Sequence, residues 1–293
     1  MPNQNLGVLG TNPDAFGVWL PDAPGNVPWQ GFLDGAAAAG YATVELGPFG
    51  YLPTDPGQLA DALAIRSLGL TCGYVSAPFH DLDGLAAALD AVRRVAVTTQ
   101  EAGAPYLMLL ASAPRDSHGR LPLDSTQWRN MVRGLAQAQK VAAEEFGLTV
   151  VYHPHVGLAV ETQAETERLI ADTGGELGIC LDVGQFAFAG GDPADFIDSH
   201  GGVVEYLHLR DLDTAVRDDC VARGVDFESA ARAGVFCEPG AGSIDFSAVV
   251  AAAERARFHG PVIVERSLLG CSEVQANEAA ARASAYFRSV GFG

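Results

Sequence analysis

The feature that most constrains this chain is an alternation of short apolar runs with longer stretches of helical periodicity, repeated eight times along 293 residues. A short apolar run bounded by turn residues is typical of a buried strand, and apolar residues three or four apart are typical of a helix. The runs predict strands at Leu6–Leu9, Thr43–Leu46, Leu70–Val75, Tyr106–Leu110, Thr149–His153, Leu177–Asp182, Val203–His208 and Val262–Glu265. The periodic stretches predict helices at Trp29–Ala39, Asp55–Ser67, Leu82–Ala102, Ser125–Phe146, Thr162–Asp172, Asp192–His200, Ser247–Arg257 and Glu273–Ser289.

Strands that alternate with helices form a parallel sheet, because parallel neighbours need a crossover connection. Eight such units predict an α/β fold, a (β/α)8 TIM barrel with its active site at the carboxyl-terminal ends of the strands. An open doubly wound sheet is the alternative, and the lack of a GxGxxG loop after any strand disfavours it. We expect one domain over residues 1–293, with a less regular insertion at Asp211–Gly242.

Four of the predicted strands end on a side chain that commonly binds metal ions. These residues are His153, Asp182, His208 and Glu265. A buried ionisable side chain is costly unless water, a charge partner or a metal satisfies it. The carboxyl ends of the strands meet at one end of a barrel, so the four endings predict one metal site. Mixed oxygen and nitrogen ligands suit Mn²⁺, Co²⁺, Mg²⁺, Fe²⁺ or Zn²⁺ without choosing among them.

The ligand from the fifth strand has two candidates, His153 and Glu161 at the start of the following helix. His153 and His155 are two residues apart and share a face on a regular strand, although Pro154 bends the chain between them. One histidine can bind the metal while the other acts as acid or base near neutral pH. In the alternative, one of them only holds a loop carbonyl.

Further polar and aromatic residues are expected around the same mouth. Glu45 ends the second strand and is interpreted as a proton-transfer or substrate-hydroxyl group, or else as a structural ion pair. Arg210 could hold an anionic or oxygen-rich substrate. Trp19 and Tyr51 follow the first two strands and could stack on a sugar ring, or simply cover the barrel. The Gly-rich turn 239–246 could cradle a phosphate, or simply begin a helix.

Composition narrows the class of protein. The net charge is −18, from 18 basic and 36 acidic residues, and such a surface repels a nucleic-acid backbone. No apolar run is long enough for a membrane span, and the first ten residues lack signal-peptide character. Cys72 and Cys180 lie in apolar runs and are interpreted as core residues rather than disulfide or zinc ligands. We expect a cytoplasmic protein that binds a small molecule and can form a homo-oligomer.

At these residues the chain resembles the xylose isomerase-like barrel superfamily of sugar phosphate isomerases and epimerases, which includes endonuclease IV. Within it, the inosose dehydratases are the nearest likeness. The stretches that carry the resemblance are 39–55, Tyr152–Gly157 with Val160–Thr162, Cys180–Gly184, His208–Asp211, Gly240–Phe246 and Val264–Glu265. The resemblance implies one divalent ion, Mn²⁺ or Co²⁺ first, with Asp182, His208 and Glu265 among its ligands. This chain has His153 where relatives carry Glu, Gln185 where they commonly carry His, and Arg210 where they commonly carry Lys.

The resemblance and the residues together predict a metal-dependent lyase or isomerase that acts on a keto-polyol or sugar through an enolate. His155, Glu45 and His153 are the candidate catalytic groups, and Arg210, Gln185, Trp19 and Tyr51 the candidate substrate contacts. Dehydration and isomerisation or epimerisation share the enolate, so both stay open. An endonuclease of several metals is disfavoured by Gln185 and the charge of −18. A non-catalytic sugar-binding barrel is disfavoured by the presence of three strand-end ligands.

Overall fold

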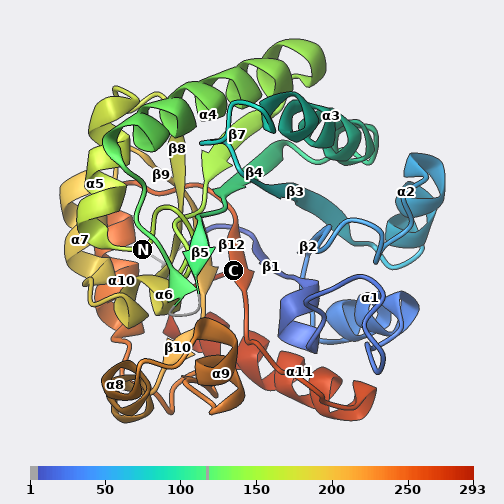
Figure 1. Cartoon of the computed structure of the whole chain (residues 1–293). Coiled ribbons are helices and arrows are strands. Elements are labelled where there is room, and N and C mark those ends of the chain that lie inside the picture. The colour runs from blue at the N-terminus through green and yellow to red at the C-terminus, as the bar shows by residue number, and fades with distance from the viewer. Residues whose placement is uncertain (1–5, 117–118) are drawn as a thin grey trace.

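A computed structural model describes residues 6–116 and 119–293 of the chain. Eight parallel strands close a barrel in the order β1-β12-β9-β8-β7-β4-β3-β2 (Figure 1), which confirms the predicted fold. Their bounds are β1 Leu9–Thr11, β2 Thr43–Glu45, β3 Gly69–Ala77, β4 Tyr106–Ala111, β7 Thr149–Tyr152, β8 Gly178–Asp182, β9 Val204–Leu209 and β12 Val262–Val264.

Helices surround the barrel (Figure 1), and all of those described below except α1 and α3 begin after a residue whose side chain caps the first turn. Their bounds are α1 Trp29–Ala38, α2 Pro56–Ala64, α3 Leu85–Glu101, α4 Ser125–Phe146, α5 Gln163–Asp172, α6 Val183–Phe188, α7 Pro193–His200, α10 Phe246–Arg255 and α11 Glu273–Val290. Reciprocal capping boxes start α4, α5 and α11. Within the described residues, no helix has the length and apolarity that crossing a bilayer requires.

Alternation along the strands divides the apolar side chains into two cores. On β4, Leu107 and Leu109 face outward and join the large core between the strands and the helices. Met108 and Leu110 face inward and join a smaller cluster inside the barrel. The inner cluster consists of Cys72, Met108, Leu110, Val151, Cys180, Tyr206 and Ile263. Cys72 and Cys180 are therefore core residues, as predicted.

Several boundaries differ from the sequence-based expectation. The first strand runs over Leu9–Thr11 rather than Leu6–Leu9, because Gly7 has a φ of 69° and Val8 is exposed. Helix α6 follows β8 directly, since the Asp182 carboxylate accepts the amide of Gln185 and so caps it. A small hairpin of β5 Arg115–Asp116 and β6 Gly119–Arg120 was not expected either.

The insertion 211–242 is more regular than its composition suggests. It contains β10 Asp211–Leu212, α8 Thr214–Arg223, α9 Phe227–Arg232 and β11 Phe236–Cys237, with β10 and β11 paired antiparallel. The buried Asp211 carboxylate accepts the amides of Gly240, Gly242 and Ile244. The Gly-rich turn 239–246 already holds a carboxylate of the protein, so it is not the phosphate cradle considered from the sequence.

Candidate active site

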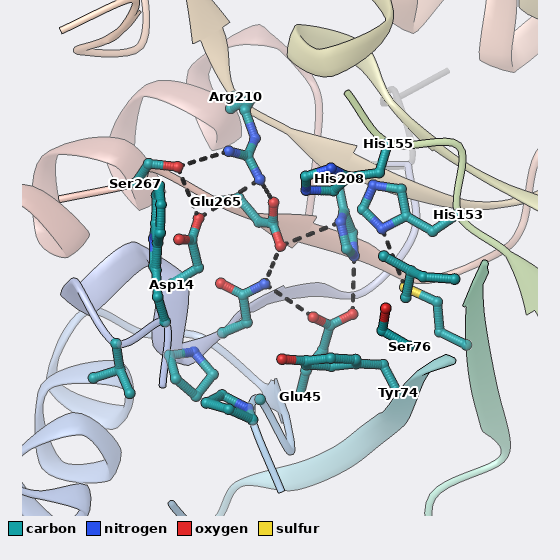
Figure 2. Close-up of a pocket in the computed structure, with 18 of the residues that line it drawn as sticks. Asp14, Glu45, Tyr74, Ser76, His153, His155, His208, Arg210, Glu265 and Ser267 are labelled. Carbon is teal, nitrogen blue, oxygen red and sulfur yellow. Dashed lines mark hydrogen bonds and ion pairs between the residues drawn. The ribbon is translucent and has the colours of Figure 1, made fainter. Parts of the chain in front are cut away.

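A cavity of about 330 Å³ lies at the carboxyl-terminal ends of the barrel strands, a size suited to a small ligand. Figure 2 shows polar side chains pointing into it from several strands. The lining residues are Asn12, Pro13, Asp14, Val18, Trp19, Glu45, Gly47, Pro48, Tyr74, Ser76, Met108, Leu110, His153, His155, His208, Arg210, Phe227, Glu265 and Ser267. The structure thus brings together side chains from the first to the last barrel strand.

His208 lies between the carboxylates of Glu45 and Glu265 (Figure 2), which lie at the ends of the two strands that flank β1. Its Nε2 is 2.9 Å from Glu45 Oε1, and its Nδ1 is 3.3 Å from Glu265 Oε1. Each ring nitrogen of His208 therefore faces a carboxylate oxygen. The ligand atoms of Glu45, His208 and Glu265 all lie within 4.8 Å of one another.

Glu45 is buried and fully engaged. Its Oε1 accepts the Tyr206 hydroxyl at 2.7 Å, and its Oε2 accepts the Asn12 amide at 3.0 Å. Burial alone would favour the neutral acid, but His208 and the hydrogen bonds from His208, Tyr206 and Asn12 more than offset it. The pKa of Glu45 therefore lies below its ordinary value, and the group is a carboxylate at neutral pH.

His153 and Asp182 occupy the neighbouring wall. His153 Nδ1 lies 3.3 Å from the thioether sulfur of Met108, which can only accept, so the other nitrogen is left without a proton. That Nε2 is 4.0 Å from Asp182 Oδ2. Burial lowers the pKa of His153 well below its ordinary value, so no imidazolium bridges the gap. A second compact group of possible ligand atoms comes from His153, Cys180 and His208.

The donor atoms of the four residues that end strands in the sequence test whether this site fits a metal ion. His153 Nε2 is buried without a hydrogen-bond partner and lies 4.0 Å from Asp182 Oδ2. Asp182 Oδ2 and Glu265 Oε2 form ion pairs with Arg210, and His208 Nδ1 lies 3.3 Å from Glu265 Oε1. Two imidazoles and two carboxylates, with one buried nitrogen unpartnered, fit a divalent cation.

Arg210 is the positive group of the site. Its Nε is 2.8 Å from Asp182 Oδ2, and its Nη2 contacts Glu265 Oε2. On its other edge, Nη1 donates to Ser267 Oγ at 2.8 Å, and Nη2 is 3.6 Å from Asp14. A β-carbon on Gly184 would lie 2.2 Å from Arg210 Cγ, so glycine there allows this placement. The guanidinium is occupied by the protein's own acceptors rather than presented to an anion.

His155 is held in one tautomer. Its Nδ1 lies 2.8 Å from the Val156 carbonyl oxygen, so this nitrogen donates and Nε2 keeps a free lone pair. Burial lowers the pKa of His155 to about 4, which makes the ring neutral at pH 7. The Gln185 side chain accepts a hydrogen bond from the Val156 amide at 3.0 Å and so holds the backbone next to His155 in place.

Four predicted site residues, namely Tyr51, Glu161, Asp182 and Gln185, are not among the residues that line the cavity. Tyr51 is buried, and its hydroxyl donates to the Val27 carbonyl. Glu161 pairs with Arg120 at 3.1 Å and accepts the Gly157 amide at 2.8 Å, so its carboxylate is engaged elsewhere. Gln185 is buried behind the His155 loop. Trp19 does line the cavity, as expected.

Sequence reasoning missed several residues that line the cavity or, like Tyr206, contact a residue that lines it. Asn12 directly follows β1, and correct placement of that strand would have pointed to it. Tyr206 and Ser267 are two residues from His208 and Glu265, so the period of an extended chain was an available signal. Asp14 belongs to a short 3-10 helix, Pro13–Phe16, and had no such signal. Burial raises the pKa of Asp14, against the opposing effect of Arg210.

Curated relatives resemble this chain over most of its length. The rhizopine catabolism protein MocC of Rhizobium meliloti is 28% identical over 254 residues, which covers 84% of this chain and 77% of that protein. The inosose dehydratase of Geobacillus thermodenitrificans is 28% identical over 261 residues, which covers 84% of each.

Solved structures share the fold at lower identity. An L-ribulose 3-epimerase superposes with a TM-score of 0.74 at 17% identity, covering 97% of this chain and 94% of that one. The IOLI protein, solved with a zinc atom, also superposes with a TM-score of 0.74 at 17% identity, covering 98% and 99%. The family model of the xylose isomerase-like TIM barrel matches residues 33–290. The chain therefore belongs to the xylose isomerase-like TIM barrel family.

Proposed function

We propose that this protein is a metal-dependent enzyme that removes the proton beside the carbonyl of an uncharged keto-polyol and then expels a neighbouring hydroxyl as water. The observation that carries the proposal is the cluster of histidine and carboxylate donor atoms, among them the unpartnered His153 Nε2, beside the neutral His155. Inosose dehydratases among the relatives support dehydration. The five unpaired cysteines support a cytoplasmic location, where thiols stay reduced.

The donor set supports one divalent ion held by His153, Asp182, His208 and Glu265. Two nitrogens and two carboxylates suit Mn²⁺ or Co²⁺, and also Zn²⁺. When bound, such an ion polarises a carbonyl and so acidifies the adjacent C–H bond. His153 is favoured over Glu161 as the ligand after β7, because Glu161 is already paired with Arg120.

The contacts favour His155 over Glu45 as the base. His155 Nε2 has a free lone pair, whereas the Glu45 carboxylate already accepts from Tyr206, His208 and Asn12. His155 takes the proton, and the C–H electron pair forms the enolate. Glu45 is left to orient a substrate hydroxyl. The enolate then expels the β-hydroxyl, which leaves as water with a proton from Asp14, the cavity carboxyl whose pKa burial raises.

The cavity offers an anionic substrate no free guanidinium or ammonium group of the protein. Among the described lining residues, Glu45 and Glu265 are carboxylates, Asp14 is the carboxyl that supplies the proton, and Arg210 is the one guanidinium. Arg210 is already shared among Asp182, Glu265, Asp14 and Ser267. A phosphate or carboxylate on the substrate would therefore find no cationic side chain and only the ion itself as a partner. This favours an uncharged substrate over a sugar phosphate or a nucleic-acid backbone.

Product analysis tests the proposal. Protein loaded with Mn²⁺, Co²⁺ or Zn²⁺ would be incubated with an inosose and with open-chain ketoses in D₂O, and the products followed by NMR. We expect metal-dependent loss of water from the inosose. Deuterium entering beside the carbonyl without loss of water would favour the epimerase or isomerase reaction instead. No turnover and no deuterium exchange with any polyol ketone, in protein that carries its ion, would reject the proposal.

A further inference from the structure

The excursion between β10 and β11 has a small apolar core of its own. Its two helices, α8 and α9, lie side by side at the edge of the molecule beside β10 (Figure 1). The cluster consists of Leu212, Cys220, Ala230, Ala231, Val235 and Phe236, with partly buried residues such as Trp19, Phe188 and Phe227 packed against it. This core is separate from the two cores of the barrel. We call residues 213–235 the cap.

The cap is tied to the barrel at several points. The β10–β11 ladder and the Asp211 carboxylate fix its two ends. Arg217 donates to the Ala187 carbonyl at 3.1 Å, which attaches α8 to the end of α6. The ring of Phe236 lies under the Arg210 guanidinium, with 4.7 Å from the guanidinium carbon to the ring centre. The cap is therefore held in a defined place over the carboxyl end of the barrel.

Phe227 is where the cap reaches the cavity. It is the one described residue of 213–235 that lines the cavity. Asp226 caps α9 by accepting the Ser229 amide at 2.7 Å, which places Phe227 in the first helical position. The Phe227 ring stacks on Trp19 with 5.8 Å between centres, and meets His155 edge-on at 4.9 Å. Both of these neighbours also line the cavity.

We propose that Phe227 is a specificity-determining residue, through which the cap adds to the cavity an aromatic wall that selects substrates with a flat apolar ring face. The proposal rests on the proposed function and goes beyond it, because nothing in that function requires the cap. Phe227 and Trp19 form this wall, and the carboxylates with Arg210 lie elsewhere around the same cavity.

Such a wall can discriminate between cyclic and open-chain substrates. A cyclic polyol ketone directs several C–H bonds to one face, and these pack on an aromatic surface. An open-chain ketose in its many conformers presents no lasting apolar face and loses more entropy on binding. Aromatic packing of this kind changes affinity by up to about tenfold. The wall therefore contributes to preference for rings rather than to the proton transfer itself.

The test compares Phe227→Ala with Phe227→Tyr and with Phe188→Leu in the metal-loaded protein. Phe188 packs on Phe236 in the same apolar cluster, 6.4 Å between ring centres, but does not line the cavity. For Phe227→Ala we expect kcat/KM on a cyclic keto-polyol to fall about tenfold, mainly through KM. On an open-chain ketose the change is within about twofold, so the preference for rings shrinks. Phe227→Tyr keeps the preference, and so does Phe188→Leu.

Two outcomes would overturn the inference while leaving the proposed function standing. One is an unchanged ring preference in Phe227→Ala. The other is an equal loss on both substrates that falls on kcat, which would assign Phe227 to the support of His155. If the wild-type protein turns over neither ketone, the proposed function fails instead. In that case the wall can still be tested by calorimetry, which measures how tightly the metal-loaded protein binds a cyclic polyol that has no ketone. Equal affinity in Phe227→Ala and in the wild type would reject the wall.

Discussion

Two successive layers of side chains inside the barrel differ in character, although they lie only two residues apart along the same strands. One layer packs the interior of the barrel, and the other carries the candidate catalytic and metal-binding groups. The lower layer is apolar apart from one hydroxyl, and the upper layer is ionisable. The matching positions, lower then upper, are Val151 and His153, Cys180 and Asp182, Tyr206 and His208, and Ile263 and Glu265. Each pair shares a direction because side chains alternate along a strand. All eight side chains are buried, so position along the strand, and not burial, separates the two layers.

The packing of the lower layer sets the positions of the side chains in the upper layer. The lower layer contains no charge and is held mainly by packing, whereas each charge in the upper layer needs a partner within contact distance. Tyr206 joins the two, since its ring packs in the lower layer and its hydroxyl reaches Glu45 in the upper. Substitutions in the upper layer should affect metal and turnover, and those in the lower layer should affect stability.

The largest expected effect comes from Asp182→Asn. Asparagine keeps the size of the side chain and still caps α6, so the change removes mainly the charge. We expect bound metal to fall well below one ion per chain, and kcat/KM to fall about a thousandfold, or about 4 kcal/mol of transition-state stabilisation. Metal analysis and steady-state kinetics measure both.

The matched control is Asp192→Asn, which alters the same kind of cap at the start of α7, away from the cavity. It should keep its metal and its turnover. Full metal occupancy in Asp182→Asn would contradict the role of Asp182 as a ligand and would favour a site formed by Glu45, His208 and Glu265.

Ile263→Ala tests the lower layer. Ile263 is fully buried, and the cavity left by its side chain should lower the free energy of unfolding by about 3 kcal/mol. Turnover per bound ion should stay near the wild-type value, because the upper layer keeps its groups. Denaturant unfolding and kinetics at matched metal content provide the two measurements.

Val274→Ala is the control for the effect of truncation itself. Val274 is 67% exposed on α11, and its loss should change stability by less than about 0.5 kcal/mol. A large loss of turnover per ion in Ile263→Ala, with stability unchanged, would contradict the division of labour between the layers.

Strand endings were predictable because their signal is local. An apolar run that stops on His, Asp or Glu can be read from a few neighbouring residues, and it located His153, Asp182, His208 and Glu265. Asn12 and Asp14 were not found, because the first strand is short and its start was misplaced by Gly7. Phe227 had no local signal at all, since it reaches the cavity only through the packing of the cap.

Some chemical roles also depended on contacts that no sequence pattern records. The sequence alone indicates that Arg210 is a free anion-binding group, but in the structure it forms ion pairs with Asp182 and Glu265. Tyr51 reads as a loop aromatic at the mouth, yet its hydroxyl is used by Val27 in the core. In both cases the partner lies more than twenty positions away along the chain, so a local pattern could not identify it.

Tyr206→Phe should give an intermediate effect, because it removes the hydrogen bond by which the Tyr206 hydroxyl joins the lower layer to Glu45. Without that donor at 2.7 Å, Glu45 keeps its contacts with His208 and Asn12 but loses one restraint. We expect kcat to fall about tenfold, or about 1.4 kcal/mol, with metal content unchanged. Tyr152→Phe removes a buried hydroxyl from an outward-facing side chain of β7 and should leave kcat unaltered. Equal losses of kcat in Tyr206→Phe and Tyr152→Phe would contradict a specific role of the Tyr206–Glu45 hydrogen bond in turnover.

Glu161→Gln should give the smallest effect, and it decides which residue after β7 belongs to the upper layer. Glu161 lies outside the cavity, and its ion pair with Arg120 is partly exposed, with side chains 24% and 16% accessible. Such a pair contributes at most about 1 kcal/mol to stability. Metal affinity, measured by calorimetry, should therefore stay within about twofold of the wild type. His153→Gln, in contrast, should lose the ion, because the buried His153 Nε2 has no hydrogen-bond partner in the protein and is free to bind it. If Glu161→Gln loses the ion while His153→Gln keeps it, the carboxylate must leave Arg120 to reach the metal, and the upper layer would then be completed by a loop rather than by a strand end.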